Sequence, residues 1–165
     1  MNFFKIFLIF FFISFFLNSC SKEEKISTVV EEDLEQQMIR AFREGYDEFE
    51  GGDALFAAKK FNEAELLFPQ SPWAPKAALM AAYVYYAQDY YFDAEYELER
   101  FIKTYPKNPD LNYAHFLLAM CYYEKIVDEK KDLGPLLKAQ NKFNFIIKEY
   151  PNSDYALDAK FKLDL

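Results

Sequence analysis

Residues 53–69 read DALFAAKKFNEAELLFP, and the spacing within this segment decides the fold. Apolar residues stand twelve, eight and five positions before Pro69, at Ala57, Phe61 and Ala64. A helix must end near such a proline, because the ring fixes φ and removes the N–H donor. A small residue where two helices touch, a bulky residue four positions later and a closing proline are typical of the second helix of a tetratricopeptide repeat.

The same spacing recurs before Pro106 and Pro151, so the pattern is an internal repeat. The matching residues are Ala94, Leu98 and Phe101, then Ala139, Phe143 and Ile146. The pattern predicts an all-α tetratricopeptide-repeat superhelix, an α-solenoid, over residues 31–165. We expect three repeats and part of a fourth, at about 33–69, 70–106, 107–151 and 152–165.

Local signals indicate where several helices begin and end. Gly51 and Gly52 are expected to end the first helix, and Asp53 to cap the second. A turn is expected near Gln88–Asp89, and Asp110 is expected to cap the first helix of the third repeat.

The third repeat is longer than the second. Pro69 and Pro106 are 37 residues apart, whereas Pro106 and Pro151 are 45 apart. The eight extra residues fall between Tyr122 and Ala139. They include the charged run 128–135, which ends in Gly-Pro. Charge runs are usually solvated, so we expect a loop; a contact surface specific to the family is the alternative.

The first 19 residues have the composition of a secretory signal. Lys5 precedes an apolar run from Ile6 to Leu17, which is too short to cross a bilayer because a spanning helix needs roughly 20 residues. We expect residues 1–19 to be a cleaved signal peptide. A short membrane anchor that stays attached is the alternative.

Cys20 is the expected lipidation site. The segment Leu17-Asn18-Ser19-Cys20 resembles the bacterial lipobox, whose cysteine becomes the acylated first residue, with palmitate among its chains. Several acyl chains hold a protein stably at a membrane, and residues 20–30 are expected to be the tether to the folded part. Ser21 stands where an aspartate signals retention in the inner membrane, which favours the outer membrane.

Charge and residue inventory argue against two classes of function. The net charge is −8, which disfavours binding to nucleic acid. The single histidine, His115, falls at a helix-packing position, and the sequence carries no Gly-rich phosphate loop, CxxC or HExxH motif. We therefore expect no catalysis, cofactor or metal, a satisfied interface role for His115, and a buried, inert thiol at Cys121.

Aromatic residues are abundant, with 13 Tyr and 19 Phe, and the repeat register predicts which of them face a binding groove. The expected groove residues are Phe42, Arg43, Tyr46, Phe49, Lys76, Leu79, Tyr83, Tyr86, Phe116 and Tyr123. The same register adds Ile39, Met80, Tyr113, Leu117 and Met120. An aromatic groove edged by Arg43 and Lys76 suits a peptide rich in aromatics that ends in a carboxylate. The alternative for any of these aromatics is plain core.

Several strings are more specific than the repeat spacing. They are Ser71-Pro72-Trp73-Ala74, Arg100-Phe101-Ile102, Tyr105-Pro106, Ala119-Met120-Cys121-Tyr122-Tyr123-Glu124 and Glu149-Tyr150-Pro151-Asn152-Ser153, with Cys20 upstream. Together they resemble the BamD family, lipoproteins of the outer-membrane β-barrel assembly machinery. The resemblance implies five repeats, of which this chain has three and part of a fourth, so we expect it to be a fragment.

The resemblance also implies a function. It implies a lipid-anchored component at the periplasmic face of the outer membrane, which binds unfolded outer-membrane proteins, a BamA-like subunit and accessory lipoproteins to promote insertion. The family's proposed role for its early repeats is recognition of the C-terminal segment of client proteins. The alternative is another periplasmic repeat adaptor, of envelope biogenesis or division.

Overall fold

A computed structural model of the chain describes residues 33–126 and 132–164. Within these ranges it contains seven helices and no strands, which confirms the all-α prediction. The helices are α2 (Leu34–Glu50), α3 (Ala54–Leu67), α4 (Ala74–Ala87), α5 (Tyr91–Thr104), α6 (Leu111–Glu124), α7 (Gly134–Glu149) and α8 (Asp154–Leu163). The predicted signal peptide, Cys20 and the tether lie outside the described residues.

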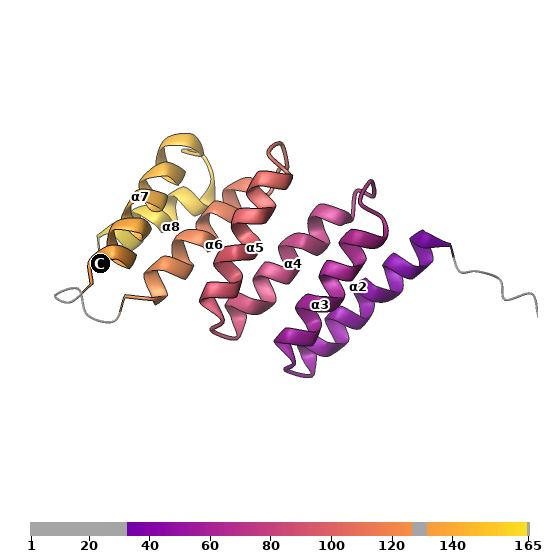
Figure 1. The fold of residues 1–165 in the computed structure, drawn as a ribbon. Helices are drawn as coiled ribbons and strands as arrows, with labels where there is room; N and C mark the ends of the chain where they lie inside the picture. Colours follow the sequence, from indigo (N-terminus) through magenta and orange to yellow (C-terminus); the bar gives the residue numbers. More distant parts are fainter. Residues whose placement is uncertain (1–32, 127–131, 165) are drawn as a thin grey trace, which may run out of the picture. The chain divides into compact units, whose positions relative to one another are not determined.

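Each helix packs against the next one in chain order, as Figure 1 shows. Helix α4 also contacts α6, and α6 contacts α8, so the first helices of successive repeats lie side by side. This is the helix-pair arrangement that the spacing of the prolines predicts. In the part of the chain that the structure describes, no helix is long and apolar enough to cross a membrane.

One cap and one turn follow the sequence prediction, and a second predicted cap does not. Asp53 caps α3, since its side chain accepts a 2.9 Å hydrogen bond from the N–H of Phe56. Asp89 occupies the expected turn with φ of 64°, a conformation that Asp tolerates. Asp110 stands at the start of α6, but its side chain makes no capping hydrogen bond. Asn108 turns the chain there, because its Oδ1 accepts the N–H of Asp110 at 2.8 Å.

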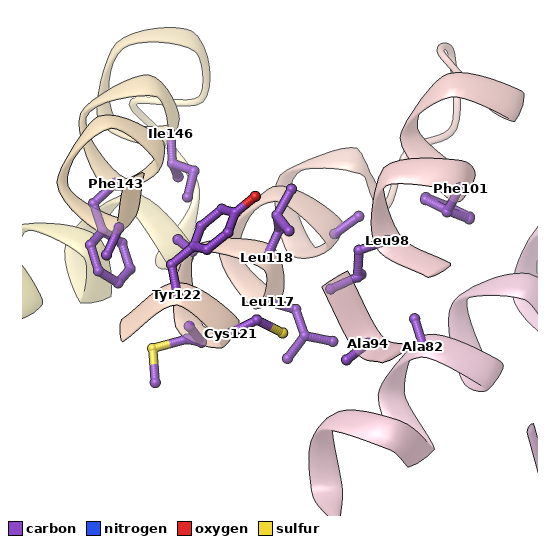
Figure 2. Packing of buried hydrophobic residues seen from close by; sticks show 14 of the residues in the cluster. Ala82, Ala94, Leu98, Phe101, Leu117, Leu118, Cys121, Tyr122, Phe143 and Ile146 are labelled. Carbon is purple, nitrogen blue, oxygen red and sulfur yellow. The ribbon is translucent and has the colours of Figure 1, made fainter. Parts of the chain in front are cut away.

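The repeat residues form the core that the spacing predicts. Phe61, Leu98 and Phe143, which occupy the same repeat position, are 0%, 0% and 1% exposed. Figure 2 shows part of the largest cluster, in which side chains of α4, α5, α6 and α7 converge around α6. Cys121 is fully buried in this cluster, and burial raises the pKa of its thiol to about 12, as expected of an inert residue.

Helices α2 and α3 approach closely at Gly45. A Cβ at this position would lie 3.0 Å from two ring carbons of Phe61, which is itself fully buried. The glycine is therefore needed for space and not for an unusual φ.

Two of the extra residues of the third repeat, which were expected in a loop, belong to a helix. Residues 127–131 lie outside the described residues, whereas Gly134 and Pro135 already belong to the first turn of α7. A proline suits this position because the first N–H groups of a helix have no partner within it. Glu95 on α5 pairs with Lys125, which follows α6, and its Oε1 lies 3.9 Å from the Nζ of Lys138 on α7.

Candidate binding site

The first pocket lies between α2 and the start of α4 and has a volume of about 510 Å³. Its lining residues are Met38, Ile39, Phe42, Arg43, Tyr46, Glu50 and Trp73. The four α2 positions Ile39, Arg43, Tyr46 and Glu50 recur at intervals of three and four, so they share one face of the helix. The lining is mostly apolar, and one residue of each charge accompanies it.

Aromatic rings build the wall of this first pocket. The ring of Phe42 lies edge-to-face against Tyr46, Phe61 and Trp73, with centroid distances of 5.4, 5.2 and 5.6 Å. Phe61 belongs to the core, whereas Tyr46 is 39% exposed and Trp73 47% exposed. The wall is therefore anchored in the core and leaves aromatic surface open to a ligand.

The second pocket lies between α4 and the start of α6 and has a volume of about 620 Å³. Its lining residues are Pro72, Lys76, Leu79, Met80, Tyr83, Asn108, Pro109, Asp110 and Tyr113. This pocket is more polar than the first, because Lys76, Asn108 and Asp110 contribute to it. Burial is the main cause that raises the pKa of Tyr113, so its phenol stays neutral and available for hydrogen bonding.

Two contacts join residues that line different pockets, and we call these four residues the divider. The Nζ of Lys76 lies 4.6 Å from the ring centroid of Trp73. The hydroxyl of Tyr46 donates to Sδ of Met80 across 3.9 Å. The two pockets are therefore neighbours linked by side-chain contacts.

Six of the ten predicted groove residues line these pockets. Phe42, Arg43 and Tyr46 line the first pocket, and Lys76, Leu79 and Tyr83 line the second. Of the further register positions, Ile39, Met80 and Tyr113 also line a pocket.

The other four predicted residues line neither pocket. Phe49 packs against Tyr83 with centroids 5.9 Å apart, and Tyr86 packs against Tyr91 at 5.8 Å. Phe116 and Tyr123 are half-buried and contact the ring of Phe143, a core residue. The assignment of these four residues to the groove stays a prediction.

Sequence reasoning missed Trp73, although a signal for it exists. Trp73 stands four residues after Pro69, and Asp110 stands four after Pro106, so the two hold the same repeat position. Each lines the pocket at the start of its own first helix. The change from Trp to Asp explains in part why the first pocket is apolar and the second polar.

His115 lies outside both pockets. It is 8% exposed, its ring centroid lies 4.6 Å from that of Phe145, and burial and then Lys142 lower its pKa to about 4. The prediction of a satisfied side chain was wrong, since Nδ1 has no hydrogen-bond partner among the described residues. Over the same residues, no group of three or more His, Cys, Asp or Glu side chains is placed to hold a metal ion.

Residues 34–165 match the model of the YfiO family, described as outer membrane lipoprotein. The chain belongs to this family. The match spans every helix that the structure describes, including both pockets and the core.

Individual relatives agree with the family match. The chain is 34% identical over 146 residues to the outer membrane protein assembly factor BamD of Caulobacter vibrioides, which covers 88% of this chain and 47% of the relative. It is 34% identical over 109 residues to BamD of Rickettsia prowazekii, covering 66% and 43%. With BamD of Neisseria meningitidis serogroup A the identity is 24% over 157 residues, covering 89% and 59%. The chain thus spans about half the length of the curated relatives it matches.

Proposed function

We propose that this chain is a lipid-anchored, non-catalytic component of the machinery that assembles β-barrel proteins into the outer membrane. Family membership carries this proposal, together with relatives named outer membrane protein assembly factor. In this proposal Cys20 is lipidated, and the folded part lies at the periplasmic face of the membrane.

The two pockets and the divider bind unfolded segments of client proteins in this proposal. The support is the chemistry of the lining: exposed aromatic rings, with Arg43 and Lys76 beside them. Arg43 and Lys76 form no ion pair within the described residues, so both cations are available to a ligand. A C-terminal segment with aromatic side chains and a free carboxylate fits this combination.

Partner subunits bind elsewhere in this proposal, and α3 and α5 offer a surface for them. Leu66 on α3 is 75% exposed, and Phe92 and Tyr96 on α5 are 76% and 68% exposed. None of the three lines either pocket. Large exposed apolar side chains are common at protein interfaces, which supports contact with a BamA-like subunit or accessory lipoproteins.

Binding to an unfolded β-barrel protein tests the proposal. The full chain is immobilised in mild detergent, and an outer-membrane β-barrel protein is diluted onto it from urea, either intact or without its last segment of about ten residues. We expect the intact client to be retained and the shortened one to be retained much less. Equal retention of both, or of an unfolded protein that is not a β-barrel, contradicts recognition of the C-terminal segment.

A further inference from the structure

Trp73 is the single tryptophan of the chain and is held on a rigid backbone with almost half of its surface exposed. Pro72 and Pro75 flank it closely and fix their own φ angles. The N–H of Trp73 donates a 3.1 Å hydrogen bond to Oγ of Ser71, a residue that is only 6% exposed. The indole is therefore positioned before any ligand arrives, which lowers the entropy lost on binding.

Two side chains contact the indole from different directions. Phe42 meets it edge-to-face, with ring planes at 71°, and the Nζ of Lys76 lies 4.6 Å from its centroid. The ammonium group has three N–H donors, and the face of a ring occupies only one side of it. The remaining donors of Lys76 are free to bind an anion, because no ion pair involves Lys76 in the described part of the chain.

Among the charged residues that line the two pockets, Lys76 is the one that contacts the indole. Arg43 directly follows Phe42, the residue that contacts Trp73. Glu50, the acidic residue of the first pocket, is eight residues after Phe42 on α2, which is about 12 Å at the rise of an α-helix. Asp110 lines the second pocket with Lys76, but no ion pair joins them. A ligand that crosses the divider therefore meets positive charge next to an aromatic surface.

We propose that Trp73 contacts the ligand directly and that Lys76 selects a carboxylate beside the aromatic side chain that Trp73 holds. The ligand is an extended peptide segment whose large aromatic side chain enters the first pocket and packs against the indole. Its carboxylate, either at the chain end or on an adjacent side chain, binds the ammonium of Lys76 at the divider. The ligand class rests on the proposed function; the roles of these two residues go beyond it.

The tryptophan supplies its own reporter. The full chain in mild detergent is titrated with a synthetic hexapeptide that ends in phenylalanine as the free acid, and the emission of Trp73 is followed. A second peptide is the same sequence as the C-terminal amide, and a third is the amide with glutamate before the phenylalanine. We expect the free acid to shift the emission saturably and the plain amide to bind about ten-fold more weakly, the effect of one charge-assisted hydrogen bond. The glutamate peptide distinguishes a side-chain carboxylate from a chain end.

Variants measured by calorimetry separate the two residues from the rest of the groove. Lys76→Met should weaken the free acid by about ten-fold and leave the amide unchanged, whereas Lys103→Met, an exposed lysine on α5, should change neither. Trp73→Ala should weaken both peptides, and Phe92→Ala, an exposed aromatic on α5, should weaken neither.

The results separate the roles proposed for Trp73 and Lys76 from the peptide-binding function of the groove. If the wild type binds the free acid, but Trp73→Ala and Lys76→Met bind it within two-fold of the wild type, the inference is wrong and the groove function stands. Equal affinity for the free acid, the plain amide and the glutamate amide excludes the carboxylate role. If the wild type binds none of the three peptides, the peptide-binding function is overturned along with the inference.

Discussion

The hydroxyl of Tyr105, which follows α5, donates a 2.6 Å hydrogen bond to Oε1 of Glu65 on α3. Glu65 is 5% exposed, and its two oxygens also accept hydrogen bonds from Arg100 at 2.9 and 2.7 Å. Arg100 in turn contacts Glu97, so one guanidinium serves two buried carboxylates. This network joins the second helices of successive repeats through polar groups.

Arg100→Met should strongly destabilise the protein, because it leaves Glu65 and Glu97 buried without a cation. Removing one partner of a buried ion pair costs about 3–5 kcal/mol, and Lys103→Met on the exposed side of α5 should cost almost nothing. Urea unfolding followed by helical circular dichroism measures both. A loss below about 0.5 kcal/mol for Arg100→Met, typical of a surface site, means that water already screens the network.

Gly45→Ala should also be destabilising, by about 1–3 kcal/mol, because its new Cβ meets the buried ring of Phe61 at 3.0 Å. Alanine favours a helix over glycine, so propensity alone predicts the opposite sign. Gly51→Ala is the matched control: Gly51 is exposed, its φ is −71°, and a Cβ there meets its nearest atoms at 3.4 Å. Thermal unfolding measures the stability of both variants. A Gly45→Ala variant more stable than Gly51→Ala would falsify the steric explanation.

Stability should fall as the pH drops from about 6.5 towards 4, because His115 must take up a proton in a buried site. Its folded pKa of about 4 lies below the usual value of 6.5, so protonation favours the unfolded chain across this window. One titrating group changes the free energy of unfolding by about 1.4 kcal/mol per pH unit. Urea unfolding at several pH values should show this slope in the wild type and a flatter one in His115→Leu. Identical slopes contradict the assignment.

Tyr83→Ala should weaken peptide binding by about thirty-fold, since loss of an interface anchor costs roughly 2 kcal/mol. Tyr96→Ala is the suitable control, because Tyr96 is 68% exposed on α5 and lines neither pocket. Tyr105→Ala is unsuitable, because it removes the hydrogen bond to Glu65. Circular dichroism first establishes that each variant is folded. Similar affinities for the two variants would place the binding site elsewhere.

Cys20→Ala should abolish lipidation, and Cys121→Ala should preserve it. The fully buried thiol of Cys121, with its raised pKa, is a poor acyl acceptor. Metabolic labelling with a fatty acid in a Gram-negative host compares the two variants with the wild type. Label retained by Cys20→Ala rules out the proposed anchor.

The helices were predictable because their signals are local. Pro69, Asp53 and the alanines at fixed offsets each act within a few residues of their own position, so the sequence reveals them directly. His115 shows where prediction from local signals stops. Its burial follows from the repeat register, but whether Nδ1 finds a hydrogen-bond partner depends on which atoms of neighbouring helices face it.

The site was predictable only in part, because register places a residue on a helix face and not within a pocket. Phe42 and Phe116 were both assigned to the groove, yet only Phe42 lines a pocket, while Phe116 packs against Phe143 and Tyr155. The divider depends on the contact between Lys76 and Trp73 and on that between Tyr46 and Met80. The second of these joins two helices, and no pattern along the chain encodes it.

Glu95 contacts both Lys125 and Lys138, so one carboxylate from α5 fastens the end of α6 and the start of α7. The packing of α6 against α7 is thus supported by ion pairs to a third helix, in addition to the direct contact between the two.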